Sequence, residues 1–188
     1  MMKHILAPIL LLVFLFPTLA LGEEVTYWDL VKREGLYYQK FTDVPFTGKT
    51  TGQKQGSFRD GKRDGPWESY YHNGQLSFKG TYKNGTSDGP WVWYWDNGQF
   101  LAKGTYKYGK REGPWVEYHD NGQLMSKGTY KNGKREGPWV EYHDNGQLKS
   151  KGTYKDGKWD GPYVSYHDNG QLSFKGTYKD GKKEGPWV

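Results

Sequence analysis

Aromatic rings, glycines and polar residues alternate along most of this chain in a pattern that returns every 24 residues. Gly-Pro-aromatic triplets begin at Gly65, Gly89, Gly113, Gly137, Gly161 and Gly185, and Asn-Gly-Gln triplets begin at Asn73, Asn97, Asn121, Asn145 and Asn169. A fixed period of this length is the signature of stacked repeats, in which no single unit can bury its apolar face alone. The pattern predicts tandem repeats over residues 60–188.

Each unit is expected to fold as two strands. In residues 113–136, runs with strand character at 115–119 and 124–131 are separated by Asn121-Gly122, and a second reversal follows at Asn132-Gly133. Asn-Gly between such runs favours a tight type I′ turn, and no apolar stripe with helical spacing exists. The sequence therefore predicts an all-β fold, an elongated single-layer antiparallel meander of about eleven to twelve strands.

A two-residue turn at Asn121-Gly122 would pair His119 with Leu124 and Trp115 with Gly128, so that an indole lies over a glycine backbone. One face then carries Trp115, His119, Leu124 and Tyr130, and the other carries Val116, Tyr118, Gln123, Lys127 and Thr129. The same ring-over-glycine contact is expected between Trp67 and Gly80, Trp91 and Gly104, and Trp139 and Gly152. The rings expected to hold the repeats together are Trp67, Trp91, Trp115, Trp139, Tyr163 and Trp187.

The ends of the chain are expected to differ from the repeats. Residues 1–22 begin with the basic Lys3, continue with an apolar run and end with small residues of the kind found at cleavage sites. This pattern predicts a signal peptide cleaved between Gly22 and Glu23. An uncleaved membrane anchor is the alternative. Residues 23–59 form a degenerate leading unit that is expected to cap the stack.

Composition narrows the possibilities further. The chain contains no cysteine, so we expect neither a lipoprotein anchor nor disulfides. Because the predicted signal peptide directs export, we expect a periplasmic or secreted protein. The net charge is +6, but acidic and basic residues are mixed within every unit, which does not favour a nucleic-acid surface.

No enzyme, metal site or cofactor is expected. No HExxH motif or phosphate-binding glycine loop is present, and acidic residues such as Glu117 recur with the repeat, whereas a catalytic pair is expected once. His119, His143 and His167 share one repeat position with Tyr71 and Trp95, so that position selects a flat ring and not a metal ligand.

The string GTYKNGKREGPWVEYHDNGQL, repeated from about Gly56 to Val188, resembles the MORN repeat in its bacterial variant form. The stretches 35–38 (GLYY) and 45–48 (PFTG) are similar to the N-terminal part of the YwqK-type antitoxin family. The resemblance implies single-layer sheets of successive hairpins and a binding role, either antitoxin-like or, as for MORN modules elsewhere, at membranes.

The functional expectation is an exported, non-catalytic scaffold that binds a protein partner. Trp and Tyr are enriched at binding hot spots, and three Trp residues break the repeat pattern: Trp93, Trp95 and Trp159. We expect these three rings to be exposed and to contact the partner. Carbohydrate or cell-wall binding through stacked rings is one alternative, and binding to a membrane surface is another.

Overall fold

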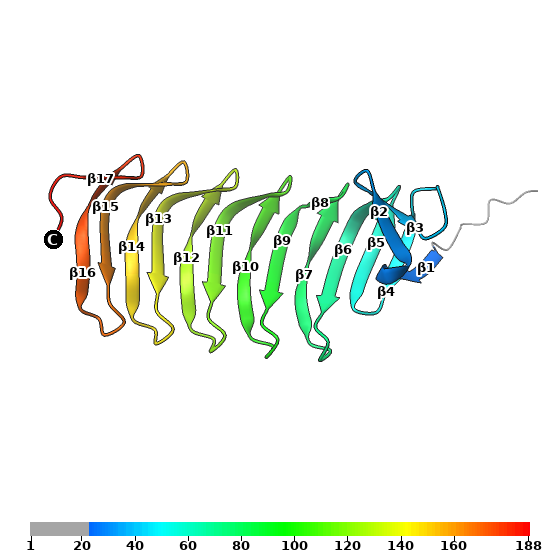
Figure 1. Ribbon diagram of the computed structural model, residues 1–188, viewed down its shortest axis with the longest axis horizontal. Coiled ribbons are helices and arrows are strands. Elements are labelled where there is room, and N and C mark those ends of the chain that lie inside the picture. The colour runs from blue at the N-terminus through cyan, green and yellow to red at the C-terminus, as the bar shows by residue number, and fades with distance from the viewer. Residues whose placement is uncertain (1–22) are drawn as a thin grey trace, which may run out of the picture.

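The computed structural model describes residues 23–188, and the predicted signal peptide lies outside these residues. The described chain forms one long, open, single-layer sheet (Figure 1). The predicted all-β meander is confirmed. The sheet has 15 strands over the described residues, more than expected, because the leading segment adds strands of its own.

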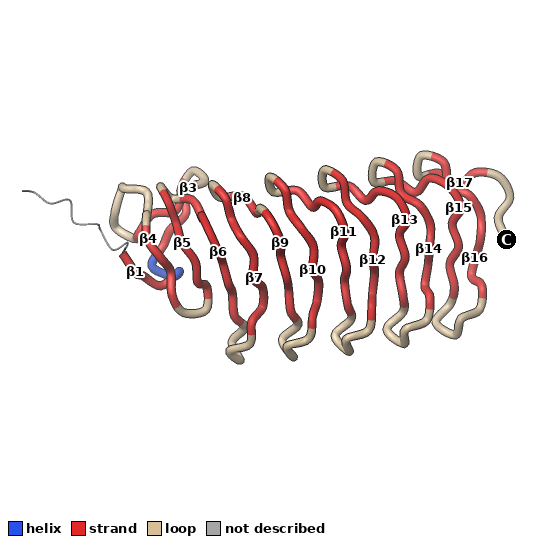
Figure 2. The backbone as a smooth tube through the Cα atoms, turned by 180° about the vertical axis from the view of Figure 1, so that it is seen from behind, coloured by secondary structure: helices blue, strands red, loops and turns tan. Residues whose placement is uncertain are grey.

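The elements are β1 (Glu23–Thr26), the 3-10 helix η1 (Tyr27–Asp29), β2 (Leu30–Arg33), β3 (Leu36–Gln39), β4 (Gly48–Thr51), β5 (Lys54–Arg59), β6 (Lys62–Tyr70), β7 (Leu76–Lys83), β8 (Thr86–Ser87), β9 (Gly89–Tyr94), β10 (Phe100–Lys107), β11 (Lys110–Tyr118), β12 (Leu124–Lys131), β13 (Lys134–Tyr142), β14 (Leu148–Lys155), β15 (Lys158–Tyr166), β16 (Leu172–Lys179) and β17 (Lys182–Glu184). From β4 onward the sheet follows chain order, with β8 paired beside β7, and β1 adds to β4 as a parallel edge strand. Strands β2 and β3 form a separate hairpin. Turns gather along the two long edges of the sheet (Figure 2).

The two reversals of each unit use different turns. At Asn132-Gly133 both residues have positive φ, 52° and 85°, as a type I′ turn requires. At Asn121-Gly122 only the glycine does, with φ 83°, so the predicted type I′ turn there is wrong. The Asn121 side chain accepts a hydrogen bond from the Gln123 N–H at 3.0 Å and donates one to the carbonyl of Asp144 in the next unit at 2.7 Å. These two bonds hold the turn and tie neighbouring units together.

The longer turn changes the pairing beside it. His119 and Gln123 close the turn through a backbone hydrogen bond of 2.8 Å, and a bulge between Glu117 and Tyr118 makes Leu124 the partner of Tyr118. The predicted pairing of His119 with Leu124 is therefore wrong. Beyond the bulge, Trp115 pairs with Gly128 as predicted.

The ring-over-glycine contact exists, but the indoles cover the glycine of the preceding strand and not the predicted glycine of the following strand, as seen at Trp67, Trp91, Trp115 and Trp139. A Cβ on Gly128 would lie 1.8 Å from Cε3 of Trp139, and a Cβ on Gly104 would lie 1.9 Å from Cε3 of Trp115. The register between β12 and β13 shifts between Lys127 and Thr129, so Gly128 has no partner in β13 and the Trp139 ring fills the space. The predicted contact of Trp115 with Gly128 is corrected accordingly.

The buried core is a ladder of rings on one face. Trp115, Tyr130, Trp139 and Tyr154 are buried, and successive rings meet edge to face with centroids 5.6, 5.4 and 6.0 Å apart. Edge-to-face contacts of this kind stabilise a core beyond the area they bury. The ladder therefore replaces the aliphatic core that a single sheet lacks.

Arginines cover this ladder. The Arg135 guanidinium lies 4.3 Å from the centroid of Trp139 and donates a 2.8 Å hydrogen bond to the Tyr154 hydroxyl. Arg111 makes the equivalent contacts with Trp115 and Tyr130. Burial raises the pKa of Tyr154 although the Arg135 hydrogen bond opposes the shift. The rings are thus shielded from water by a cation that is itself hydrogen-bonded.

The leading segment closes one end of the ladder. Phe46, Phe58 and Trp67 form a second buried cluster. Arg63 donates hydrogen bonds to the hydroxyls of Tyr82 and Tyr27, both at 2.9 Å, and so joins the leading segment to the first repeats. Burial alone would raise the pKa of Tyr27, but its hydrogen bond with Tyr37 and the positive charge of the nearby Arg63 lower that pKa below its usual value.

Candidate binding groove

The face opposite the ring ladder carries a row in which lysine and valine alternate. Lys127 in β12 pairs with Val116 on one side and Val140 on the other. Lys151 in β14 likewise pairs with Val140 and with Val164. Because every second residue of a strand points to the same face, these side chains lie on the face that the Trp residues do not occupy.

A second row runs parallel to the first, nearer the Gly-Pro bends. It is made of the cross-strand pairs Pro114 with Thr129, Pro138 with Thr153, and Pro162 with Thr177. The Pro members and Thr129 are exposed. Proline rings and threonine methyl groups make this row apolar, while each threonine keeps a hydroxyl for hydrogen bonding.

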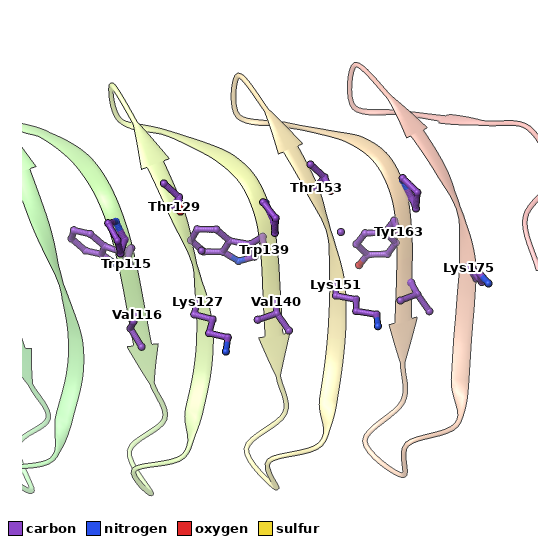
Figure 3. A pocket seen from close by; sticks show the side chains of 16 residues that line it. Trp115, Val116, Lys127, Thr129, Trp139, Val140, Lys151, Thr153, Tyr163 and Lys175 are labelled. Carbon is purple, nitrogen blue, oxygen red and sulfur yellow. The ribbon is translucent and has the colours of Figure 1, made fainter.

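Together the two rows line a groove of about 710 Å³ that extends from β11 to β16. Its residues are Pro114, Trp115, Val116, Lys127, Gly128, Thr129, Pro138, Trp139, Val140, Lys151, Gly152, Thr153, Pro162, Tyr163, Val164 and Lys175, many of them labelled in Figure 3. The lining includes no acidic side chain. A groove of this size with an apolar lining and a few convergent charges has the composition of a binding site.

The lysines of the groove are exposed, and no acidic side chain among the described residues neutralises their charge. Lys127, Lys151 and Lys175 are all exposed, and none forms an ion pair within residues 23–188. The acids of the same units are engaged elsewhere: Glu141, for example, faces Arg135 at 3.4 Å on the ring face. The same repeat position is also an exposed lysine at Lys79 and Lys103. The groove face is therefore positive, although the chain as a whole mixes charges.

The three Trp residues expected to be exposed are half-buried. Trp93 stacks on Trp91 with centroids 5.6 Å apart and lies 5.4 Å from Trp115. It lines a second, smaller cavity of about 250 Å³ with Leu101, Ala102, Arg111, Trp115, Glu117 and Met125. It therefore belongs to the ring ladder and not to an exposed surface.

Trp159 and Trp95 also serve the fold. Trp159 stacks on Tyr154 with centroids 3.8 Å apart, and Trp95 donates a 3.1 Å hydrogen bond from Nε1 to the carbonyl of Tyr118. Among the described residues, the exposed large aromatics are others: Trp28, Phe41, Phe100 and Tyr108. That any of the three Trp residues contacts a partner stays a prediction.

The histidine position is also structural. Nε2 of His119 lies 3.1 Å from the carbonyl oxygen of Tyr142, and His143 makes the same contact with Tyr166 at 3.0 Å. Tyr71 uses its hydroxyl in the equivalent way, at 2.8 Å from the carbonyl oxygen of Tyr94. Each ring thus links its own turn to the next unit. No group of residues that could hold a metal ion occurs between residues 23 and 188.

Comparison with known families agrees with this architecture. The profile described as MORN repeat variant matches residues 63–84, 87–108, 111–132, 135–156 and 159–180. The chain belongs to the MORN repeat variant family. Each match begins just before a Gly-Pro bend and ends near the next type I′ turn, so the family's unit coincides with the structural unit.

Other comparisons add little. No curated protein matches the chain. Among solved structures, it is similar to one titled crystal structure of GtfA/B complex bound to UDP and GlcNAc, at 15% identity and a TM-score of 0.19. That match covers 78% of this chain and 28% of the other. No helix within residues 23–188 has the length and hydropathy needed to cross a bilayer.

The sequence places Lys127 on one face with Val116 and Thr129, but the mixing of charges within every unit hides the lysine row. The available signal was the recurrence of lysine just before the ring-covered glycine in five units, at Lys79, Lys103, Lys127, Lys151 and Lys175. Its meaning depends on the structure, because only the strand pairing shows that the row from β11 to β16 contains no acid, whereas Lys79 pairs with Glu68.

Proposed function

We propose that this protein is an exported, non-catalytic repeat scaffold that binds a protein partner along the groove of the lysine face. The observation that carries the proposal is the groove itself: three successive units present the same apolar side chains and unpaired lysines on one continuous surface. A surface of identical units suits a partner that is held along its length. An antitoxin-like or immunity-like role outside the cytoplasm agrees with a secreted scaffold of this kind.

The ring face is the weaker candidate for the contact surface. Its Trp side chains are almost fully covered: Trp67 and Trp115 are each 1% exposed and Trp139 is 2% exposed. Hot-spot residues must be reachable by the partner, so rings this deeply buried contribute to stability first. The same burial gives little support to carbohydrate binding, which needs an open ring face for stacking.

Binding to an anionic membrane surface is the second candidate. The observation in its favour is the row of exposed lysines on one face, because clustered lysines attract anionic lipid headgroups. The valines between the lysines are half-buried or buried, so they cannot insert into the acyl region of a bilayer, and this favours a protein ligand. Vesicle sedimentation separates the two candidates.

Site-specific photo-cross-linking tests the proposal. The photoreactive residue benzoylphenylalanine replaces Thr129, an exposed groove position, and in a matched control it replaces Tyr108, an exposed turn residue that is 76% accessible. With cells of the native source, we expect a discrete protein adduct from the Thr129 variant and none from the Tyr108 variant. Equal adducts from both positions, or none from either, would refute the groove as the binding surface.

A further inference from the structure

The lysine row has a spacing that selects among protein ligands. Lys127, Lys151 and Lys175 lie in β12, β14 and β16, so consecutive lysines are two strands apart. At about 4.8 Å per strand, their repeat along the groove is roughly 9.6 Å. Valine lies between consecutive lysines in the same row, so each charge is set in an apolar surround.

An extended ligand in this groove runs across the strands. The face of a paired sheet offers no free backbone N–H or C=O, since the ladders of both neighbours use them. The ligand is therefore recognised through its side chains, and it must repeat its charge every 9 to 10 Å, estimated from the strand spacing.

A polyproline II helix has this period. It has three residues per turn and rises 3.1 Å per residue, so every third side chain returns to the same side after about 9.3 Å. A β-strand ligand fits less well, because its side chains alternate with a period of two and a third residue points away from the groove. The proline and valine side chains of the groove also offer an apolar surface for the rings of a proline-rich ligand.

Building on the proposed function, we propose that the groove binds an acidic, proline-rich segment of its partner in the polyproline II conformation, with a carboxylate at every third residue. Lys127, Lys151 and Lys175 each receive one carboxylate, and the half-buried Val140 contacts the residues between the first two carboxylates. The protein thus recognises its partner because the spacing of the partner's carboxylates equals the spacing of the groove lysines.

Two synthetic peptides of identical composition test this proposal with the chain from residue 23 onward. One is five repeats of Glu-Pro-Pro, and the other has five consecutive Glu followed by ten Pro. We expect the periodic peptide to bind about two- to fivefold more tightly, because it presents carboxylates in step with three lysines whereas five consecutive Glu can meet only two, and each exposed pair adds a modest factor. Equal binding of both peptides would overturn the proposal, because it would show attraction by net charge alone.

Two variants with the same loss of charge locate the contact. Lys127, Lys151 and Lys175 are changed to Gln in one. Lys107, Lys131 and Lys155 are changed to Gln in the other; these exposed residues end β10, β12 and β14, on the same face but beyond the proline–threonine row. We expect the first variant to lose about tenfold or more in affinity for the periodic peptide and the second to stay within about twofold. Equal losses would overturn the assignment to the groove.

The outcome also separates this inference from the function beneath it. If the Thr129 position cross-links a protein but the periodic peptide fails to bind, the scaffold stands and the polyproline II assignment is wrong. If vesicles containing phosphatidylserine bind in a manner that needs the groove lysines, and the periodic peptide does not compete, the ligand is a lipid surface and this inference is overturned.

Discussion

A single added methyl group at Gly128 tests the corrected ring-over-glycine contact. A Cβ at this position would lie 1.8 Å from Cε3 and 2.4 Å from Cζ3 of Trp139, so Gly128→Ala must displace a ring that is only 2% exposed. Overpacking of this kind costs typically about 1–3 kcal/mol. The displaced indole also leaves its edge-to-face contacts with Tyr130 and Tyr154, at 5.4 and 6.0 Å, which raises the cost further.

Urea denaturation followed by circular dichroism measures the effect. We expect Gly128→Ala to lower the free energy of unfolding by about 2–3 kcal/mol. The neighbouring Lys127→Ala, on the exposed face, should change it by less than about 0.5 kcal/mol. Comparable losses from both substitutions would refute the assignment of the faces.

A double-mutant cycle identifies the ring concerned. In the background of Trp139→Phe, the smaller ring leaves room for the added methyl group, so Gly128→Ala should cost less than in the unmodified chain. In the background of Trp115→Phe, the cost should be unchanged, because Trp115 covers Gly104. If instead Trp115→Phe reduced the cost and Trp139→Phe did not, Gly128 would be covered by its register partner Trp115, and the reasoning would be refuted.

Three further predictions concern the turns, the ring ladder and the leader. Asn121→Ala removes both the turn bond to Gln123 and the bond to the Asp144 carbonyl, and should cost about 1–3 kcal/mol of unfolding free energy in urea, with Lys131→Ala as a neutral control. Because burial raises the pKa of Tyr154, its stabilising effect is present below about pH 10 and is lost as the pH rises through the raised value. The stability of Tyr154→Phe should accordingly fall less steeply above about pH 10 than that of the unmodified chain. Cell fractionation with N-terminal sequencing should find a chain that begins at Glu23 outside the cytoplasm, and a cytoplasmic chain that begins at Met1 would refute export.

The repeating fold could be predicted because ring, glycine and turn residues recur at fixed positions and leave no competing helical pattern. The turn types could not be assigned in this way, because Asn-Gly occurs at both reversals. The Asn121 side chain bonds Gln123 in its own unit and Asp144 in the next, and its φ lies outside the positive region. The bond to Asp144 depends on how the units stack, so one unit of sequence does not reveal it. The direction of each indole depends on the bulge beside Gly128, which pairing rules do not reveal.

The aromatic residues that break the repeat pattern show why deviation alone did not identify exposed residues. Trp159 stands at the position that Arg135 holds one unit earlier, beside Tyr163, which replaces the larger Trp139. Its ring fills the remaining space, with centroids 3.8 Å from Tyr154 and 4.8 Å from Tyr163. The change is therefore a compensation within the ring ladder.

Trp93 has a similar origin. It replaces the equivalent of Glu117 in the unit where Ala102 stands in place of Ser126, and Glu117 and Ser126 are joined by a 2.8 Å hydrogen bond. In the unit that lacks this polar pair, the Trp93 ring fills the space beside Ala102. Such paired changes become visible only when the positions that touch one another are known.

The central claim is that the two faces of one sheet have separate roles: the ring ladder holds the fold and the lysine groove holds the partner. The most direct test introduces Lys127→Glu, Lys151→Glu and Lys175→Glu together into the Thr129 cross-linking variant, and measures both thermal unfolding and adduct formation. The account predicts a melting temperature close to that of the parent and loss of the partner adduct. An adduct that persists in full on this charge-reversed face would contradict it.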